Sequence, residues 1–302
     1  MRKQFCDALV NRSSNSEMIF LTGDLGFMAL EPLQETLNER FVNMGVAEQN
    51  MISIAAALSH EGWETWVYSI APFCYARPFE QIRNDICFHN LPVKIIGNGG
   101  GYGYGVMGPT HHAIEDYGIM LTLPNMKTLI PAFDEDVFTV IEIAGHMKNP
   151  VYIRLGKGEI NSNYVVPKYN SWRQLTYGGG NVIIGAGPIV GTFIEKLNFL
   201  DEFIRPNLWV VTEMPIEKNT IPNELLNQLS KDKDLFVVEE HVRRGGLGSE
   251  LALFIIENKI QIGDFHHLFA RAHHYEKYGS QNFLRQQSKI DIDSLLELLG
   301  YS

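Results

Sequence analysis

The carboxylate Glu48 lies at the start of a stretch, from Ala47 to His60, whose apolar residues predict a helix. Gly45 supplies a turn just before it, and the alanines at 55–57 indicate a helix packed inside the protein. The helix dipole favours a carboxylate in the first turn, so Glu48 can be read as a helix-start charge alone. A carboxylate on a buried helix, however, needs a partner. Glu48 is therefore the first candidate functional residue.

Two adjacent histidines follow a glycine-rich segment. Residues 97–108 hold seven glycines in twelve positions, and Pro109-Thr110-His111-His112 comes directly after them. Glycine lets backbone approach a ligand closely, although such a segment also suits a flexible surface loop. It lacks the Gly-Lys-Ser/Thr ending of a P-loop. Adjacent imidazoles need not point at one ion, and no third ligand accompanies them, so we predict no metal site in this chain.

Aromatic side chains gather near a predicted strand end, between Tyr68 and Tyr75, with Phe73 between them. Open α/β sheets bind ligands at the carboxyl ends of their strands, so these rings are expected to form an apolar wall of a site. Each ring taken alone is better explained as part of the core.

Short apolar runs alternate with longer amphipathic stretches along the whole chain, which predicts an α/β fold of two doubly wound sheet domains. We expect a first domain at 1–160, a linker at 161–176 and a second domain at 177–302. Strands are expected at 18–22, 65–70, 93–97, 128–131, 151–155, 181–184, 208–212, 235–239 and 267–270, and helices at 47–60, 77–89, 113–121 and 134–146.

Composition excludes several classes of protein. The formal net charge of -10 argues against a nucleic-acid partner, because such proteins concentrate lysine and arginine. No apolar run is long enough to span a membrane, and the first residues lack the apolar core of a signal peptide, so a cytoplasmic location is expected. Cys6, Cys74 and Cys87 are too few and too scattered for a disulfide framework.

Several motifs occur in one order along nearly the whole chain. They are Gly45-Val46-Ala47-Glu48-Gln49-Asn50-Met51, the aromatic segment leading to Glu80-Gln81-Ile82-Arg83, Leu91-Pro92-Val93, Gly108-Pro109-Thr110-His111, Leu123-Pro124-Asn125-Met126, Val238-Glu239-Glu240-His241, Gly245-Gly246-Leu247-Gly248-Ser249 and Tyr278-Gly279-Ser280. This order resembles the transketolase and 1-deoxyxylulose-5-phosphate synthase family. The resemblance covers only the second half of a full-length transketolase, namely its pyrimidine-binding and C-terminal domains.

The resemblance implies roles for the candidate residues around a thiamine diphosphate cofactor. Glu48 would hydrogen-bond N1′ of the aminopyrimidine and so favour the imino tautomer that activates the cofactor. Phe73 would stack on the same ring, with Tyr75 and Tyr68 as alternatives because the segment aligns with shifts of one to three residues. His111 would lie near the reacting carbonyl and stabilise charge on its oxygen. Asp24 resembles an acidic residue near the cofactor.

The residues expected at the substrate agree less well with the family pattern. Arg2 and Lys157 resemble basic sugar-phosphate ligands, and His112 stands where transketolases usually carry glutamine. Met107 replaces an aspartate that contacts a donor hydroxyl, and a thioether cannot take over that acceptor role. Met28 and Gly99 stand where transketolases place serine and histidine phosphate ligands. A sugar other than the standard pentose phosphates is therefore expected. Either its anionic group is held differently, or a larger acceptor reaches over the side opened at Gly99.

The half of the family that would hold the diphosphate is absent. Gly23-Asp24-Leu25 breaks the Gly-Asp-Gly motif that binds the diphosphate and its metal, and no other copy occurs in the sequence. The resemblance thus implies an N-terminal partner subunit that holds Mg²⁺ (or Ca²⁺), in an α2β2 assembly with two copies of this chain. Two alternatives remain open: the β subunit of a 2-oxoacid dehydrogenase or decarboxylase, and a non-catalytic stabilising or regulatory subunit.

Overall fold

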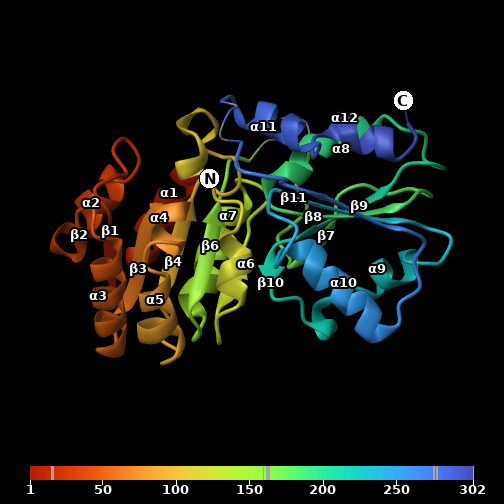
Figure 1. Ribbon diagram of the computed structural model, residues 1–302. Helices are drawn as coiled ribbons and strands as arrows, with labels where there is room; N and C mark the ends of the chain where they lie inside the picture. The colour runs from red at the N-terminus through yellow and green to blue at the C-terminus, as the bar shows by residue number, and fades with distance from the viewer. Residues whose placement is uncertain (15–16, 159, 161–163, 275, 277, 302) are drawn as a thin grey trace.

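The structure, a computed structural model, describes residues 1–302 except 15–16, 159, 161–163, 275, 277 and 302. It contains two α/β units, each with a largely parallel sheet between layers of helices, which confirms the predicted fold class (Figure 1). The first unit carries the N-terminus and the second the C-terminus.

The first sheet has the strand order β10-β5-β6-β4-β3-β1-β2. Its strands are β1 (Met18–Thr22), β2 (Phe41–Asn43), β3 (Glu64–Ile70), β4 (Lys94–Asn98), β5 (Lys127–Leu129), β6 (Val151–Leu155) and β10 (Glu213–Met214). All neighbours pair in parallel except β10, which runs antiparallel to β5. Every residue of β4 and β6 is buried, as expected for strands that are covered on both faces.

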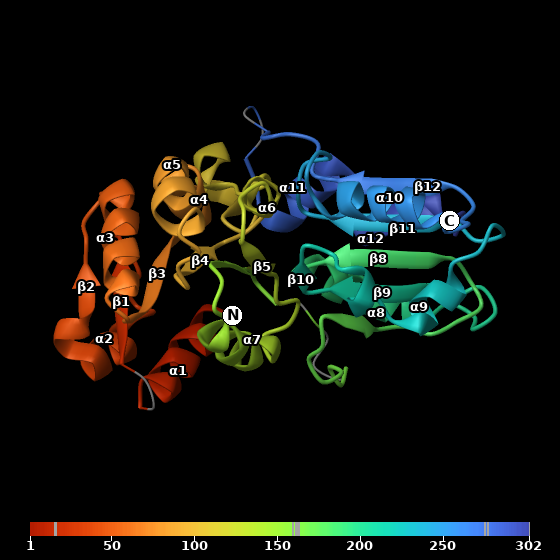
Figure 2. The ribbon, with the colours of Figure 1, turned by 90° about the horizontal axis from the view of Figure 1, so that it is seen from below.

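Two helical layers cover this sheet (Figure 2). The apolar residues of α1 (Arg2–Ser13), α2 (Glu31–Leu37) and α7 (Asp136–His146) pack in one core cluster, on one face. Those of α3 (Glu48–His60), α4 (Ala71–Tyr75) and α6 (Asp116–Leu121) pack in a second cluster on the opposite face. The layers explain why α3 is alanine-rich, since its small side chains lie against the sheet.

Most elements expected in the first unit are confirmed within a few residues. The helix expected at 77–89 is instead a short α5 (Phe79–Gln81) that continues as a π-helix, η2 (Ile82–Cys87). The helices α1, α2 and α4 and the short strand β2 were not expected. Helix α1 has a weakly patterned sequence with polar residues between its buried ones, so periodicity did not reveal it.

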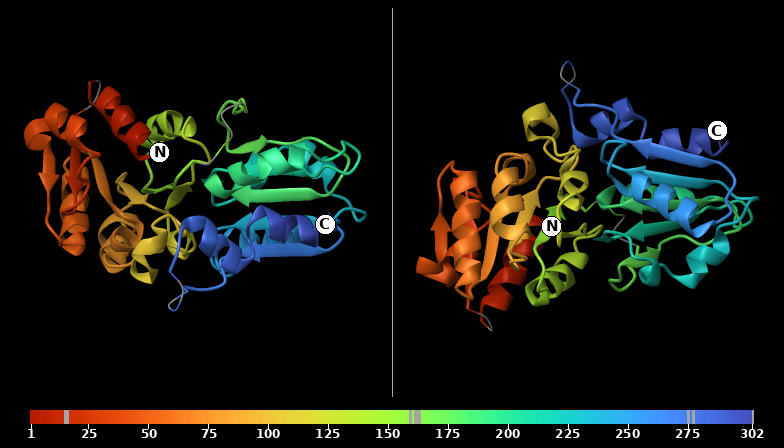
Figure 3. Two further views of the ribbon diagram at one scale, coloured as in Figure 1. Left: turned by 90° about the horizontal axis from the view of Figure 1, so that it is seen from above. Right: turned by 60° about the horizontal axis from the view of Figure 1, so that its bottom comes forward.

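The second unit has the strand order β12-β11-β8-β9-β7. Its strands are β7 (Trp172–Gln174), β8 (Val182–Ala186), β9 (Asn207–Val211), β11 (Leu235–Glu239) and β12 (Phe265–Phe269). Helices α8 (Gly191–Asn198), α11 (Gln281–Ser288) and α12 (Ile292–Leu298) pack on one face, and α9 (Asn223–Gln228) and α10 (Leu247–Asn258) on the other (Figure 3).

The expected linker, 161–176, needs a correction. Residues 161–163 lie outside the described residues, but residues 172–174 form β7, which pairs antiparallel with β9 at the edge of the second sheet. Trp172, Arg173 and Gln174 are all buried. Because two of these three residues are polar, the sequence pattern did not predict a buried strand. Inside the protein their side chains pair with residues that are distant in the sequence.

Strand β10 and Arg173 are two of the long-range features that join the units. Strand β10, which follows β9 of the second unit, extends the edge of the first sheet at β5. Arg173 on β7 reaches the start of α7, where its Nη1 and Nη2 each donate to an oxygen of Asp136 at 2.7 Å. Both side chains are almost fully buried. A buried, bidentate ion pair of this kind is costly to break from one side.

Among the described residues, none of the helices has the length and apolar content that crossing a bilayer requires.

We predict that Arg173→Met lowers the free energy of unfolding by about 3–5 kcal/mol, because it leaves the Asp136 carboxylate buried without its countercharge. Guanidinium denaturation followed by circular dichroism measures the loss. Lys3→Met is the matched control, since the Lys3–Asp7 pair is exposed and its removal is expected to cost under about 1 kcal/mol. Equal effects of the two substitutions would contradict the role given to Arg173.

Candidate active site

Glu48 is the first residue of α3, and its side chain is only 5% exposed. Its Oε1 accepts a hydrogen bond from Nη1 of Arg77 at 2.9 Å. An open pocket of about 640 Å³ lies beside this pair and is lined by Val46, Ala47, Glu48, Gln49, Asn50 and Arg77. The helix start thus presents a buried acceptor at the wall of a space large enough for a small ring system.

Phe73 lies on α4, immediately after β3 ends at Ile70. The guanidinium carbon of Arg77 lies 3.9 Å from the centroid of the Phe73 ring. One arginine therefore touches both the aromatic face and the buried carboxylate, which places Phe73 and Glu48 around one small volume. The sequence predicted that both residues would serve one ligand, and the structure brings them together.

His111 lies between two aromatic rings. Its ring centroid is 5.1 Å from that of Phe73 and 6.0 Å from that of Tyr104, both in edge-on geometry. Its Nδ1 lies 3.0 Å from the Thr110 hydroxyl. These contacts fix the plane of the imidazole and leave Nε2 as the atom with which it can meet a substrate oxygen.

His112 points the other way, into the contact between the two units. Its Nε2 donates to the carbonyl oxygen of Gly105 at 2.9 Å, and its ring stacks 6.5 Å from that of His273 in the second unit. Burial lowers the pKa of His112. The residue therefore braces the glycine-rich segment and does not share the position of His111.

Glu115 links this histidine region to the aromatic segment. It accepts hydrogen bonds from Nε2 of His273 at 2.6 Å and from the Tyr75 hydroxyl at 3.2 Å. Burial raises the pKa of Glu115, but the hydrogen bonds of His273 and Tyr75 and the charges of His273 and His241 together outweigh it, and the net shift of the pKa is downward. Tyr75 is itself buried, and burial and the neighbouring carboxylates Asp116 and Glu115 raise its pKa.

Tyr68, one of the three aromatic candidates, needs a correction. It is 1% exposed, and its ring stacks on Phe5 at 5.5 Å within the core between the sheet and α1. No face of the ring is open to a ligand, because side chains of a β-strand alternate and Tyr68 points to the helix-covered face opposite Glu48. Asp24 is exposed and accepts from Asn43 at 3.0 Å in a separate pocket, and its role stays a prediction.

The glycine-rich segment is held between the two units. A Cβ on Gly101 would lie 2.7 Å from Nη2 of Arg154 and from Cδ of Glu240, and one on Gly105 would lie 2.8 Å from the carbonyl oxygen of Gly279. The glycines at these positions therefore admit a side chain of each unit and the backbone of the second unit. The alternative of a flexible surface loop is wrong for this part of the segment.

The substrate candidates lie around the same edge. Arg2 and Lys157 are exposed and flank Met1, whose sulfur accepts from the Gly156 amide. Met107 and Met28 are exposed. The space expected at Gly99 is filled, since a Cβ there would lie 2.1 Å from the Tyr104 ring. Of the two alternatives for the substrate, an acceptor that reaches over an open Gly99 side is wrong for this reason.

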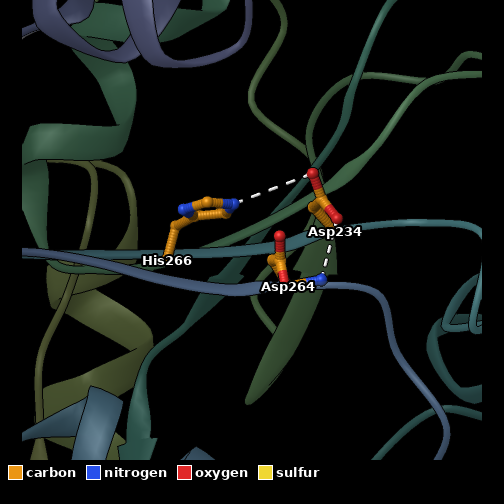
Figure 4. A group of neighbouring side chains, drawn as sticks. All are labelled: Asp234, Asp264 and His266. Atoms are coloured by element: carbon orange, nitrogen blue, oxygen red, sulfur yellow. Dashed lines mark hydrogen bonds and ion pairs between the residues drawn. The ribbon is translucent and has the colours of Figure 1, made fainter.

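One group of side chains in the described part of the chain has the spacing of metal ligands: Asp234, Asp264 and His266 (Figure 4). Asp234 accepts from the amide of Asp264 at 2.8 Å, and its carboxylate lies 3.7 Å from Nε2 of His266. The group is at the amino ends of β11 and β12, away from the edge at which parallel sheets bind ligands. It ties two strands together.

The arrangement around Glu48 fits a flat, nitrogen-bearing ring. The guanidinium of Arg77, which is planar and carries N–H donors, already makes the two contacts that such a ring would make: stacking on Phe73 and donation to Glu48. The aminopyrimidine that the family resemblance implies has the same properties. Among the described residues, no acidic cluster that would bind a diphosphate-bound cation lies near Glu48.

Four residues of this region were missed by sequence reasoning: Arg77, Tyr104, Glu115 and His273. Arg77 follows Phe73 by one helical turn, a spacing that brings side chains together and was the available signal. His273 contacts Glu115 across 158 positions of sequence, and no local pattern could have paired them.

Comparison with known proteins finds relatives that match most of this chain. Residues 11–162 match the family described as transketolase, pyrimidine binding domain. A protein of Actinobacillus succinogenes that is named as one subunit of apulose-4-phosphate transketolase is 30% identical over 274 residues, which cover 89% of this chain and 86% of that protein. The protein of the same name from Phocaeicola vulgatus is 29% identical and covers 86% and 85%, respectively.

A solved structure described as a split gene transketolase, inactive β4 tetramer, has the same fold. It superposes with a TM-score of 0.81 at 26% sequence identity, over 99% of this chain and 96% of that chain. Each of these proteins is thus similar to this one over almost its whole length.

We predict that acid weakens this protein through His112. Since burial lowers the pKa of His112, the folded state binds its proton less well than the unfolded chain, and stability falls as pH drops below about 6.5. His112→Gln, which cannot titrate, should lose less melting temperature between about pH 8 and about pH 5. The exposed His89→Gln is the control, and an equal acid loss in wild type and His112→Gln would contradict the assignment.

Proposed function

The chain belongs to the transketolase family, and from that premise we propose that it is the C-terminal subunit of a split, thiamine-diphosphate-dependent transketolase. The observation that carries the proposal is the shared volume between Glu48 and Phe73, filled by the Arg77 guanidinium. The length of the match supports it, because two relatives that are named as single subunits of a transketolase correspond to this chain almost end to end.

Thiamine diphosphate, when bound, supplies a nucleophilic carbon that cleaves and forms bonds next to a carbonyl group. In the proposed site Glu48 holds a proton at N1′ of the aminopyrimidine, and Phe73 orients that ring by stacking. His111, fixed between Phe73 and Tyr104, donates to the oxygen of the sugar carbonyl. The second unit holds the glycine-rich segment that carries this histidine.

The remaining cofactor contacts are assigned to a second polypeptide. The chain has no Gly-Asp-Gly motif, so the diphosphate and its Mg²⁺ (or Ca²⁺) are proposed to be held by an N-terminal transketolase subunit. An exposed apolar side chain at the site supports this: Val46 lines the pocket beside Glu48 and is 76% exposed. A two-fold α2β2 complex is the closed assembly that satisfies both kinds of subunit.

For the substrate we propose a phosphorylated sugar other than the standard pentose phosphates, to or from which a two-carbon ketol unit is transferred. Exposed Arg2 and Lys157 suit an anionic group. Met107 offers no hydroxyl acceptor, and Tyr104 fills the Gly99 side, so the sugar must differ from the usual one at those points. The names of two relatives, which refer to apulose 4-phosphate, support a non-standard sugar.

The proposal is tested by reconstitution. We predict that the chain alone shows no transketolase turnover and no tight binding of thiamine diphosphate with Mg²⁺, and that both arise when the N-terminal subunit is added. Isothermal titration calorimetry measures the binding, and light scattering measures the mass of the complex. Tight, Mg²⁺-dependent binding by the isolated chain would show that no partner is needed.

Replacement of the carboxylate tests its assigned role. Glu48→Gln keeps the shape and the hydrogen bonds of the side chain but loses the charge, so kcat of the assembled enzyme should fall by at least about 100-fold with the fold intact. Hydrogen–deuterium exchange at C2 of the cofactor, followed by NMR, should slow as well. Glu80→Gln, which changes an exposed carboxylate on α5, is the control. Near-normal exchange in Glu48→Gln would refute the role.

A further inference from the structure

The side chain of Arg77 makes two separate contacts, one with an aromatic ring and one with a carboxylate. Arg77 lies just before Pro78, at the end of the aromatic segment, and its side chain turns back across the ring of Phe73. From there Nη1 reaches Oε1 of Glu48, at the start of a different helix, at 2.9 Å. The arginine thus lies over the aromatic face and against the buried carboxylate at the same time.

We propose that Arg77 occupies the aminopyrimidine position of this chain and must leave it before the cofactor binds. The inference rests on the proposed function, in which Phe73 and Glu48 receive that ring. A guanidinium and an aminopyrimidine are both flat, and both donate N–H groups in their plane. Two flat groups cannot stack on the same area of Phe73 and donate to the same oxygen of Glu48, so the two compete.

The exposure of the two ionic partners shows which of them moves. Glu48 is 5% exposed and sits on the first turn of α3, so it is fixed by the fold. Arg77 is 44% exposed on a long, flexible side chain. The open pocket beside the pair, lined in part by Gln49 and Asn50, gives the guanidinium a solvated place to go. Displacement therefore requires a rotamer change of Arg77 alone.

The contact also has a reason to exist. A buried carboxylate without a partner is costly, and an arginine placed against it removes that cost while the cofactor is absent. The same contact lowers apparent cofactor affinity, because only the fraction of molecules with Arg77 displaced is ready to bind. Arg77 would thus stabilise the empty subunit and reduce its affinity for the cofactor.

The test measures cofactor affinity in the assembled complex with the N-terminal subunit. Dissociation constants for thiamine diphosphate with Mg²⁺ are determined by calorimetry for wild type, Arg77→Ala and Arg77→Met. Arg83→Ala is the matched control, since Arg83 is an exposed arginine of the same segment that bonds only to its neighbour Asn84 among the contacts described. We expect both Arg77 variants to bind the cofactor at least about fivefold more tightly than wild type, and Arg83→Ala to match wild type.

A second measurement distinguishes an Arg77 that occupies the cofactor position from an Arg77 that only positions Glu48. If Arg77 occupies the site, the cofactor-free complex of Arg77→Ala melts at a lower temperature than wild type, and the cofactor raises that temperature by more. If Arg77 only positions Glu48, Arg77→Ala binds the cofactor more weakly and Arg77→Lys restores part of the affinity, which overturns the inference. Unchanged affinity in both Arg77 variants also overturns it.

The proposed function and the inference fail in different ways. Should the wild-type complex bind no thiamine diphosphate, or Glu48→Gln leave catalysis untouched, the proposed function fails and the inference with it. Should wild type bind and Glu48→Gln lose activity while Arg77→Ala does not bind more tightly, only the inference is overturned.

Discussion

The buried carboxylate of Glu240 is the contact on which the position of the site depends. It comes directly after β11 of the second unit and accepts the amide of Tyr102 at 3.0 Å and Nη2 of Arg285 at 3.1 Å. Arg154 donates to its backbone carbonyl at 2.8 Å. Because Tyr102 lies in the glycine-rich segment, a charge in the second unit fixes the loop that carries His111. A buried carboxylate neutralised on several sides holds its partners in one arrangement.

The neighbouring residue, Glu239, does the same for the helix on the other side of the contact. It accepts the Tyr117 hydroxyl from α6 and the amides of Leu247 and Gly248 at the start of α10, at 2.7 and 2.9 Å. The helix dipole of α10 favours the negative charge there. The end of a single strand thus binds both the loop and a helix of the first unit. This explains how a second unit that contributes no residue to the volume around Glu48 still determines where its neighbours lie.

The sequence allowed the prediction of what depends on local pattern. Strand β6 and the start of α3 at Glu48 were expected within one residue, since apolar runs and a preceding glycine define them. The choice among Tyr68, Phe73 and Tyr75 could not be made, because a strand passes into a helix within this segment and side-chain direction changes period there. The strand β7 was hidden for another reason: Arg173 is neutralised by Asp136, 37 positions away.

The glycine-rich segment shows the same limit. Seven glycines indicate that other atoms approach the backbone closely, but they do not indicate which atoms. In this structure many of the approaching atoms belong to the side chains of Arg154, Glu240 and Tyr104. A segment of the same composition could also bind a phosphate group. Only the group that contacts the glycines distinguishes a phosphate-binding segment from one that packs against side chains. Residue types determined the chemistry of the candidate site, whereas the position of the glycine-rich segment also depends on a contact made across 138 positions, between Tyr102 and Glu240.

The charged and apolar parts of the site edge are stabilised differently. The buried charge of Glu48 is neutralised within the chain by Arg77, so the empty subunit carries no unpaired carboxylate at this point. Val46, an apolar side chain at the rim of the pocket beside this pair, stays 76% exposed. Burial of apolar surface favours association roughly in proportion to the buried area. Exchange of an ion pair for another hydrogen bond, in contrast, changes the free energy little. Subunit assembly would therefore draw its free energy from the rim. Cofactor binding would depend on the exchange at Glu48, and the two events can be separated by substitutions at different residues.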